Sequence, residues 1–352
     1  MFGLAIIVFS VALALLAYVV SPDNSPSGNE QILQLETHPP GFSIQILKKP
    51  KASYNPTGVL EGIKNGFVTD YEPIPIVNYR VEGNTLFYTE YRGRVFKAED
   101  RKVALSEFTE GRNVQVDDLV EKRKFWLGTD KFGRDILSRL IIGVRVSLSV
   151  GLVSVIISLI IGIVLGALAG YFKGWVDDVI MWVINVFWSI PTLLLAMGLY
   201  VSAVNFFDDK LTLIFVAVGI TMWVETARIV RGQFLGIREL EYVSAARSLG
   251  YSNTRIIFKH ILPNIMGPVI VVACANFANA ILVESGLSYI GLGIQPPAPS
   301  WGSMLNEYKD FIDTNKAYLA LFPGAAIMLL VLAFNLVGNG LRDALDVKGQ
   351  LD

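Results

Sequence analysis

The sequence predicts an all-α polytopic membrane protein with six transmembrane helices and a small β-rich extracytoplasmic insert after the first helix. Hydrophobic residues make up 53% of the 352 residues. Charged residues make up only 17%, against about 25% in soluble domains, so much of the apolar surface must face lipid or other helices. Six stretches approach the length of about 20 apolar residues that a spanning helix needs. A long polar segment, rich in Gly, Pro and Tyr, separates the first two stretches.

The six predicted spans differ in how cleanly they end. The first has no basic residues before it and a poor cleavage site, so we expect a retained anchor rather than a signal peptide. Pro191 is expected to break the third span and to free a backbone carbonyl. The spans are residues 2–20, 147–171, 179–207, 211–227, 265–283 and 317–341.

Charge predicts the orientation of these spans. The loop between the fourth and fifth spans is the most basic in the chain, and basic loops remain in the cytoplasm. This orientation places the N-terminus and the C-terminal tail in the cytoplasm and the polar segment outside. The basic residues of this loop are Arg228, Arg231, Arg238, Arg247, Arg255 and Lys259.

The chain is therefore divided into five parts. Residues 1–20 form the first transmembrane helix, and residues 21–125 form the extracytoplasmic insert, in which Glu82-Gly83-Asn84 separates two strand-like runs as in a hairpin. Apolar side chains on one face and charged ones on the other predict an interfacial amphipathic helix over residues 126–146, with Thr129 or Asp130 as its cap. Residues 147–341 form a five-helix core, and residues 342–352 form a cytoplasmic tail.

Several classes of function receive no support from the sequence. The net charge of −1 does not point to nucleic acid. The single cysteine, Cys274, excludes an intrachain disulfide, and the isolated His38 and His260 give no reason to expect a metal site. The phosphate-binding pattern G-x-x-x-x-G-K-[ST] is absent, and no catalytic constellation can be assembled, so we expect no enzymatic activity and no ATP site in this chain.

The cytoplasmic loop at residues 239–264 has the pattern of two short helices around a glycine. Gly250 is suited to end the first helix in a left-handed conformation, and Ser252 or Asn253 to cap the second, which Pro263 should stop. Such a compact knob could dock in a groove on another protein, although an ordinary basic loop would share these features. The apolar and small residues Tyr242, Ala245, Ala246 and Leu249 have the spacing of one helical face.

This loop resembles the EAA loop of ABC-importer permeases, which is the coupling helix that fits a cleft on the cytoplasmic ATPase. Ser244 stands where the motif has its leading glutamate. The resemblance implies a type I ABC importer permease fold and contact with the ATPase through Tyr242, Ser244, Ala245, Ala246, Gly250, Leu262 and Pro263.

Three further motifs resemble the dipeptide and oligopeptide permease subfamily. The first is LGTDKFGRDILSRL at residues 127–140, and the second is LGIQPPAPSWGSML at residues 292–305. The third is Phe334-Asn335-Leu336 followed by GLRDALD at residues 340–346. The resemblance implies a bacterial inner-membrane importer with a second homologous permease subunit, two ATPase subunits that bind ATP, and an extracytoplasmic substrate-binding protein. It does not extend to residues 21–125.

Polar residues inside spans are candidates for the transport pathway, because they are costly against lipid. Asn276 and Asn279 are expected to share a pore-lining face, and Glu284 either lines the pathway or pairs with an arginine of the interfacial helix. These side chains could also be hydrogen-bonded glue between helices. The candidates are Asn185, Ser189, Asn276, Asn279, Glu284 and Asn335.

Other functions remain open. The cargo could be nickel chelates or peptide antibiotics instead of ordinary peptides. A secondary transporter acting alone would show internal repeats or buried coupling charges, and a membrane-anchored sensor or enzyme would need a site in residues 21–125. Gly162, Gly166 and Gly170 form a small-residue ridge that could pack within this subunit or on a partner.

Overall fold

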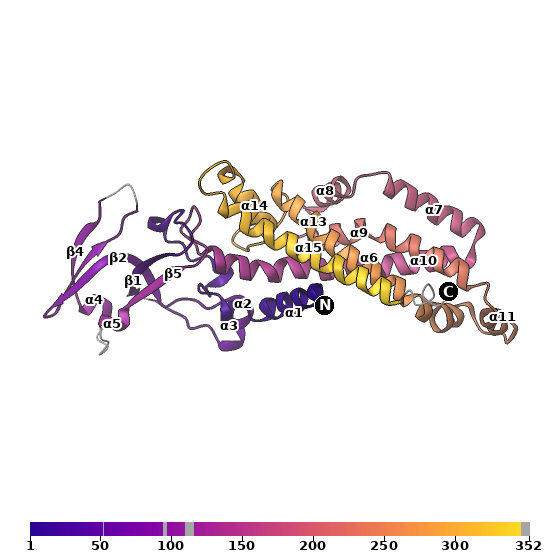
Figure 1. Cartoon of the computed structure of the whole chain (residues 1–352), viewed down its shortest axis with the longest axis horizontal. Helices are drawn as coiled ribbons and strands as arrows, with labels where there is room; N and C mark the ends of the chain where they lie inside the picture. Colours follow the sequence, from indigo (N-terminus) through magenta and orange to yellow (C-terminus); the bar gives the residue numbers. More distant parts are fainter. Residues whose placement is uncertain (52, 94–96, 110–115, 346–352) are drawn as a thin grey trace.

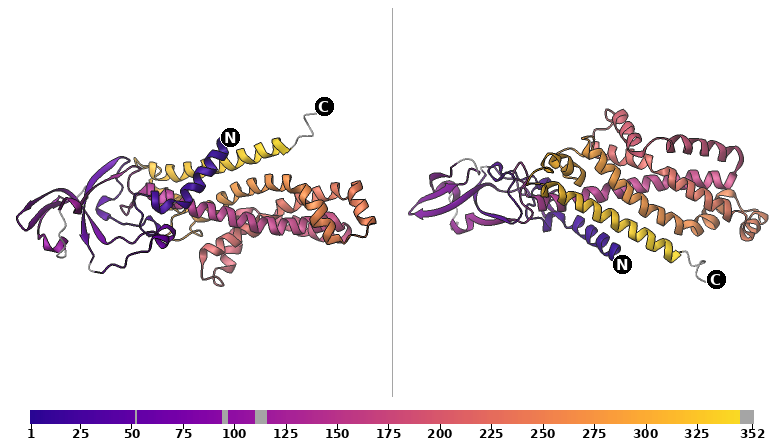
Figure 2. Two further views of the ribbon diagram at one scale, coloured as in Figure 1. Left: turned by 90° about the horizontal axis from the view of Figure 1, so that it is seen from below. Right: turned by 45° about the horizontal axis from the view of Figure 1, so that its top comes forward.

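The computed structural model describes residues 1–51, 53–93, 97–109 and 116–345, so residues 346–352 of the predicted tail lie outside it. A helical bundle carries a β-sheet at one end (Figure 1), and the two further views show the same elongated arrangement (Figure 2). The described chain thus has two parts, joined where α6 (Ile136–Phe172) meets the segment after α2 (Ala17–Val20).

The sheet is antiparallel, with the strand order β4-β3-β2-β1-β5. Its strands are β1 (Phe42–Pro50), β2 (Tyr71–Glu82), β3 (Thr85–Glu90), β4 (Glu99–Ala104) and β5 (Val120–Phe125). The hairpin between β2 and β3 turns at Gly83, whose positive φ of 60° suits the tight turn that the sequence predicts there. Short helices α3 (Val59–Asn65), α4 (Ser106–Thr109) and α5 (Val116–Leu119) connect the strands.

The bundle consists of long helices joined by short ones. The long helices are α1 (Phe2–Leu15), α6 (Ile136–Phe172), α7 (Gly174–Trp188), α8 (Thr192–Ala203), α9 (Lys210–Thr221), α10 (Trp223–Ile237), α13 (Met266–Tyr289) and α15 (Tyr318–Leu345). The short ones are α11 (Glu241–Ser248), α12 (Asn253–Arg255), α14 (Trp301–Tyr308) and five single turns, at Pro26–Gly28, Leu33–Leu35, Ile256–Ile261, Leu262–Ile265 and Lys309–Phe311.

The predicted count of six spans is not confirmed. Among the described residues, four helices are long and apolar enough to cross a membrane, or five if a bent pair is counted as one span. That pair is α7 and α8, which meet at an angle of 92°. Pro191 lies at this break, as the sequence predicts, because its ring prevents the helix from continuing through it. Helix α1 has only 14 residues and falls short of the required length.

The interfacial helix predicted over residues 126–146 is not a separate element. Helix α6 runs without a break from Ile136 to Phe172, and the preceding residues form a loop. The predicted caps Thr129 and Asp130 are wrong, since Asp135 caps α6 by accepting a hydrogen bond from the backbone of Ser138. The charged stripe that suggested a helix lying on the membrane is instead buried under neighbouring segments.

The glycine ridge of α6 packs against α10 within the same subunit. A Cβ atom at Gly162 would lie 2.5 Å from Cβ of Thr226, and one at Gly166 would lie 2.5 Å from the carbonyl oxygen of Ala227. At Gly170 the nearest atom, Cβ of Phe234, would also be at 2.5 Å. The two backbones are therefore as close as small residues allow. Of the two alternatives that the sequence leaves open, packing within this subunit is the one observed.

A methyl group on this ridge should force α6 and α10 apart. We expect Gly166→Ala to lower the free energy of unfolding by about 1–3 kcal/mol, the usual cost of overpacking. Thermal unfolding of the purified chain in detergent measures the effect. Gly232→Ala on α10 is the matched control, because a Cβ there meets nothing within 4 Å. Equal midpoints for the two variants would contradict the close contact.

Candidate functional site

The loop at residues 239–264 lies at the end of the bundle opposite the sheet, where α11 is the outermost helix (Figure 1). Val243 and Ala246 of α11 are buried in a cluster with Phe234 and with Ile256 and Ile261 of the following turn. Gly250 ends α11 with a φ of +76°, and Ser252 caps α12 by accepting a hydrogen bond from the backbone of Arg255. Both local predictions are confirmed, and the loop is a packed unit.

The predicted face of α11 is divided between the core and the surface. Ala246 is 4% exposed and belongs to the core of the loop. Tyr242 and Leu249 are 42% and 72% exposed, and Ser244, Ala245 and Gly250 are exposed as well. The unit therefore presents an apolar surface that nothing in the described chain covers.

The sequence predicts that Pro263 stops the second helix, but in the structure the chain continues in helical turns through this residue. A π-helical turn at Ile256–Ile261 and a 3₁₀ turn at Leu262–Ile265 carry the chain into α13. Pro263 lies in the first positions of the 3₁₀ turn, where its missing N–H removes no hydrogen bond. Leu262 is half-buried and Pro263 is exposed beside α11.

Polar contacts attach this loop to the end of α6. The hydroxyl of Tyr171 donates to Oδ1 of Asn253 at 2.8 Å, and the guanidinium of Arg238 donates to the carbonyl oxygen of Tyr171. Lys173 pairs with Glu239 at 2.8 Å. The loop is thereby attached to α6 as well as to α10 and α13, which precede and follow it in the chain.

Asn276 and Asn279 do not share a pore-lining face. Asn276 is 1% exposed, and its Nδ2 donates to Ser158 of α6 at 3.2 Å and to Thr226 of α10 at 3.1 Å. Asn276 thus joins three helices, whereas Asn279 is exposed. The 60° offset between positions three residues apart is enough to separate a buried side chain from an exposed one.

Three other pathway candidates, Asn185, Ser189 and Asn335, lie on the surface of this subunit. Asn185 and Ser189 are exposed at the end of α7, where Asn185 accepts a hydrogen bond from Arg228 at 3.2 Å. Asn335 is exposed on α15. The structure therefore brings Asn185 and Ser189 together but not the whole set.

Glu284 does not pair with an arginine in the described structure. It is fully buried in α13, and Ser288 donates to its Oε1 at 2.7 Å. The same serine hydroxyl accepts a hydrogen bond from the backbone of Ile294 at 3.3 Å. Glu284 thus supports the loop that follows α13, and other carboxylates take the arginines.

Those carboxylates form a buried cluster that the sequence analysis missed. Nε of Arg134 donates to Oδ2 of Asp130 at 2.6 Å, and Nη2 of Arg134 pairs with Glu307. Arg139 lies 3.3 Å from Glu307, and Tyr308 donates to Asp130 at 3.0 Å. Burial and the Asp130 carboxylate raise the pKa of Tyr308 well above its usual range, so the hydroxyl stays protonated. The cluster joins the start of α6 to α14.

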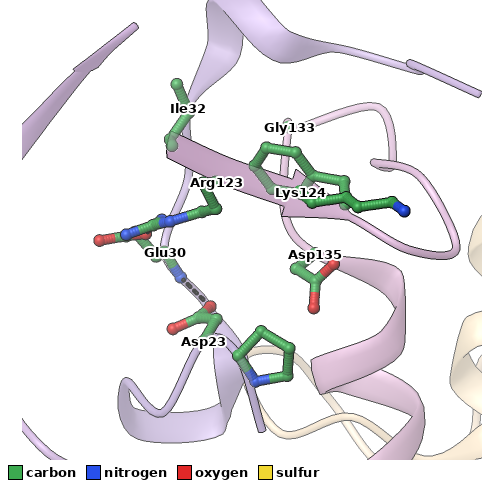
Figure 3. Close-up of a pocket in the computed structure, with 9 residues that line it drawn as sticks. Asp23, Glu30, Ile32, Arg123, Lys124, Gly133 and Asp135 are labelled. Atoms are coloured by element: carbon green, nitrogen blue, oxygen red, sulfur yellow. Dashed lines mark hydrogen bonds and ion pairs between the residues drawn. The ribbon is translucent and has the colours of Figure 1, made fainter. Parts of the chain in front are cut away.

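A second buried cluster lies between the sheet and α6 (Figure 3). Asp23 accepts a hydrogen bond from the backbone of Glu30 at 3.1 Å, and Glu30 pairs with Arg123 of β5. The backbone of Asp23 donates to Ser138 of α6 at 2.8 Å. The enclosed space here is about 10 Å³, room for about one water, so it is a structural joint and no ligand pocket. Burial raises the pKa of Asp135 to about 6.

Four or five apolar spans, a packed cationic loop at one end and a sheet at the other define a polytopic membrane protein with separate surfaces at its two ends. The chain belongs to the family of binding-protein-dependent transport system inner membrane components, whose model matches residues 162–348. The predicted membership among ABC-importer permeases of the dipeptide and oligopeptide type is thereby confirmed.

Three relatives illustrate the similarity, each over 223 residues that make up 63% of this chain and 72% of the relative. The glutathione transport system permease protein GsiD of Pectobacterium atrosepticum is 43% identical. The dipeptide transport system permease protein DppC of Alkalihalophilus pseudofirmus is 43% identical, and the oligopeptide transport system permease protein OppC of Escherichia coli K12 is 44% identical.

A solved structure is similar in fold. A chain from the inward-facing MetNI methionine ABC transporter superposes with a TM-score of 0.50 and 20% identity. The match covers 58% of this chain and 95% of that chain.

The raised pKa of Asp135 predicts a specific pH dependence. Burial gives this carboxyl a pKa of about 6 in the folded chain, against an ordinary value of 3.8, so the folded state favours the protonated form. The protonated Asp135 carboxyl therefore adds its full contribution to the free energy of unfolding below about pH 4. This contribution, about 3 kcal/mol, is lost as pH rises through 6. We expect Asp135→Asn, which keeps a capping oxygen, to remove this loss when thermal unfolding is followed from pH 4 to pH 7.

Asp209→Asn is the matched control for this measurement. Asp209 also caps a helix, but it is exposed, and hydrogen bonds from Thr212 and the backbone lower its pKa. Its replacement should therefore leave the loss of stability between pH 4 and pH 7 in place. Parallel pH curves for the wild type and Asp135→Asn would show that Asp135 is not the titrating group.

The arginine cluster predicts a large cost for removing Glu307. Glu307→Ala leaves Arg134 and Arg139 buried without this carboxylate, which should cost about 3–5 kcal/mol of unfolding free energy. Glu239→Ala breaks a solvent-exposed ion pair with Lys173 and is expected to leave the thermal transition unchanged. Similar transitions for the two variants would mean that the cluster contributes little.

Proposed function

We propose that this chain is a permease subunit of an ATP-driven importer that passes peptides across the bacterial cytoplasmic membrane. Family membership supports the transport role, and the relatives named for glutathione, dipeptide and oligopeptide transport support a peptide cargo. In this proposal the chain works with a second homologous permease subunit, two ATPase subunits that bind the ATP, and an extracytoplasmic substrate-binding protein.

The exposed apolar surface of α11 is the observation that carries the proposal. Tyr242, Ala245 and Leu249 project from a unit whose other side is tightly packed, as a protein that docks in a groove requires. Ser244, Gly250, Leu262 and Pro263 surround this surface and complete the proposed contact with the ATPase. The serine gives this contact a hydroxyl where the EAA motif of the family has a carboxylate.

The basic residues of this end support its position in the cytoplasm. Arg247, Arg255 and Lys259 belong to the loop, so by the positive-inside rule the loop lies in the cytoplasm and the sheet outside in this proposal. A cytoplasmic location of both chain termini requires in addition that residues 2–20, in α1 and α2, cross the membrane. Closure of the ATPase dimer on ATP would then pull α11 and shift the bundle between inward-facing and outward-facing states, by as much as ATP prefers the closed dimer.

The proposed pathway uses the exposed polar groups of the spans. Asn185, Ser189, Asn279 and Asn335 are available to substrate or to the second permease subunit. Asn276 and Glu284 are engaged inside the bundle and act as support for the pathway helices.

Reconstitution tests this function directly. The chain is co-expressed with candidate ATPase subunits and a candidate second permease subunit from its source organism, purified as a complex and placed in vesicles with a candidate binding protein. Peptides of two to five residues should stimulate ATP hydrolysis and enter the vesicles, whereas nickel chelates should not. Purification without any ATPase, or uptake driven by an ion gradient alone, would refute the proposal.

Replacement of Gly250 should uncouple transport from ATP hydrolysis. A Cβ at this position meets nothing within 4 Å, so Gly250→Val acts through its unfavourable positive φ and distorts the turn between α11 and α12. We expect peptide uptake to fall at least tenfold while the subunit remains inserted in the membrane. Uptake into vesicles and membrane-fraction yield are the two measurements.

Gly83→Val is the matched control. Gly83 also has a positive φ and nothing within 4 Å of its Cβ, but it lies in the sheet hairpin. It imposes the same kind of strain far from α11 and should leave uptake near the wild-type rate. Normal uptake by Gly250→Val would remove α11 from the coupling mechanism.

A further inference from the structure

Helix α3, inside the insert, carries two strongly exposed apolar side chains. Val59 is 72% exposed and Leu60 is 86% exposed, and they are adjacent at the start of the helix. Single exposed apolar residues are common on protein surfaces and need no explanation. The position of this pair relative to the membrane-spanning helices gives it significance.

The structure places α3 at the level where the apolar segments of the bundle end. Helix α6 has no charged residue over residues 146–172, and Arg145 is the first charge before that run. Nη1 of Arg145 donates to the carbonyl oxygen of Lys64, the residue before the last of α3, at 2.8 Å. The same guanidinium lies 5.1 Å from the ring of Tyr18, near the end of the uncharged residues 2–20.

Close packing fixes α3 at this level. Phe67, just after α3, packs on Ala17, Tyr18 and Ile142, and its backbone donates to Asn24 at 2.8 Å. Gly66 approaches Pro26 so closely that a Cβ would lie 2.7 Å from that residue. The helix is therefore attached to the bundle, and Figure 1 shows it beside α2 rather than out on the sheet.

The exposed side of α3 continues a surface that faces lipid. Val19 and Val20 of α2 are at least half exposed, and α2 contacts α3 directly. Glu61, Lys64 and Asn65 supply exposed polar groups on the same short helix. An apolar edge with charges beside it, held at the end of a spanning segment, is the arrangement of a helix at a membrane interface.

We propose that α3 anchors the insert to the membrane surface, with Val59 and Leu60 inserted at the boundary between lipid headgroups and acyl chains. The anchor fixes the sheet relative to the bilayer at a second place besides its joint with α6. It requires only that the bundle spans the membrane and is independent of the cargo and of the ATPase contact.

Spin-label accessibility tests this anchor in the full chain. Cys274 is replaced by alanine, Leu60→Cys is labelled with a nitroxide, and the protein is placed in nanodiscs of phosphatidylcholine and phosphatidylglycerol. Oxygen, which concentrates in lipid, and a water-soluble nickel chelate are used as collision partners. We expect a ratio of oxygen to nickel accessibility at position 60 that is several times the ratio at Val81→Cys, an exposed site on β2.

The outcomes separate three environments. High nickel accessibility at position 60, equal to that at position 81, would place α3 in water and overturn the proposal. Shielding from both reagents would show a protein partner on α3 and would overturn it as well. Val59→Cys gives a second measurement at the same depth and should agree with position 60.

Discussion

The close contact between α6 and α10 is the constraint on which the rest of the bundle depends. Lipid removes the hydrophobic force between helices, so their association depends on tight packing and a few interhelical hydrogen bonds. Gly162, Gly166 and Gly170 provide the packing, and the hydrogen bond from Asn276 to Thr226 adds α13 to the same pair. The loop at residues 239–264 extends from α10 and leads into α13. In the proposed mechanism, a force on this loop would therefore act on three helices that are packed and hydrogen-bonded to one another.

Local signals predicted the parts of the site that depend on backbone chemistry. Gly250 adopts a positive φ, Ser252 caps the next helix, and Pro191 breaks a span, because each effect arises within a few residues of chain. Pro263 shows the limit of such reasoning. A proline interrupts a helix where a backbone N–H would have to donate to the preceding turn or where its ring would clash with that turn, and neither applies in the first positions of a new 3₁₀ turn.

The features that the sequence did not predict depend on contacts between distant segments. Arg134 and Glu307 are separated by 173 positions, and nothing in either local pattern announces the pair. The charged residues after Gly133 have the spacing of the water-facing side of an interfacial helix. In the structure, however, Arg139 of this stripe is only 2% exposed. Amphipathic spacing shows that a helix has two kinds of face, but it does not show which face water reaches. The six-span count is not confirmed for a related reason, since a run of apolar residues does not determine where a helix bends or ends.

The two ends of the bundle differ in how far their side chains are paired or covered within this subunit, and this difference bears on how the subunit could work. At the sheet end, buried carboxylates and arginines pair with one another and hold the start of α6, α14, β5 and the segment after α2 together. At the opposite end, the packed loop leaves Tyr242 and Leu249 uncovered, and this is the surface that we propose the ATPase subunit contacts. A subunit with buried ion pairs at its sheet end and an exposed docking surface at the other could change conformation when a partner binds this surface. Its contacts with the insert would not have to break. Because α6 runs unbroken from Ile136 to Phe172, one helix connects the loop contacts at Tyr171 with the cap at Asp135, and in the proposed mechanism a partner that moves the loop would act on the insert through this helix.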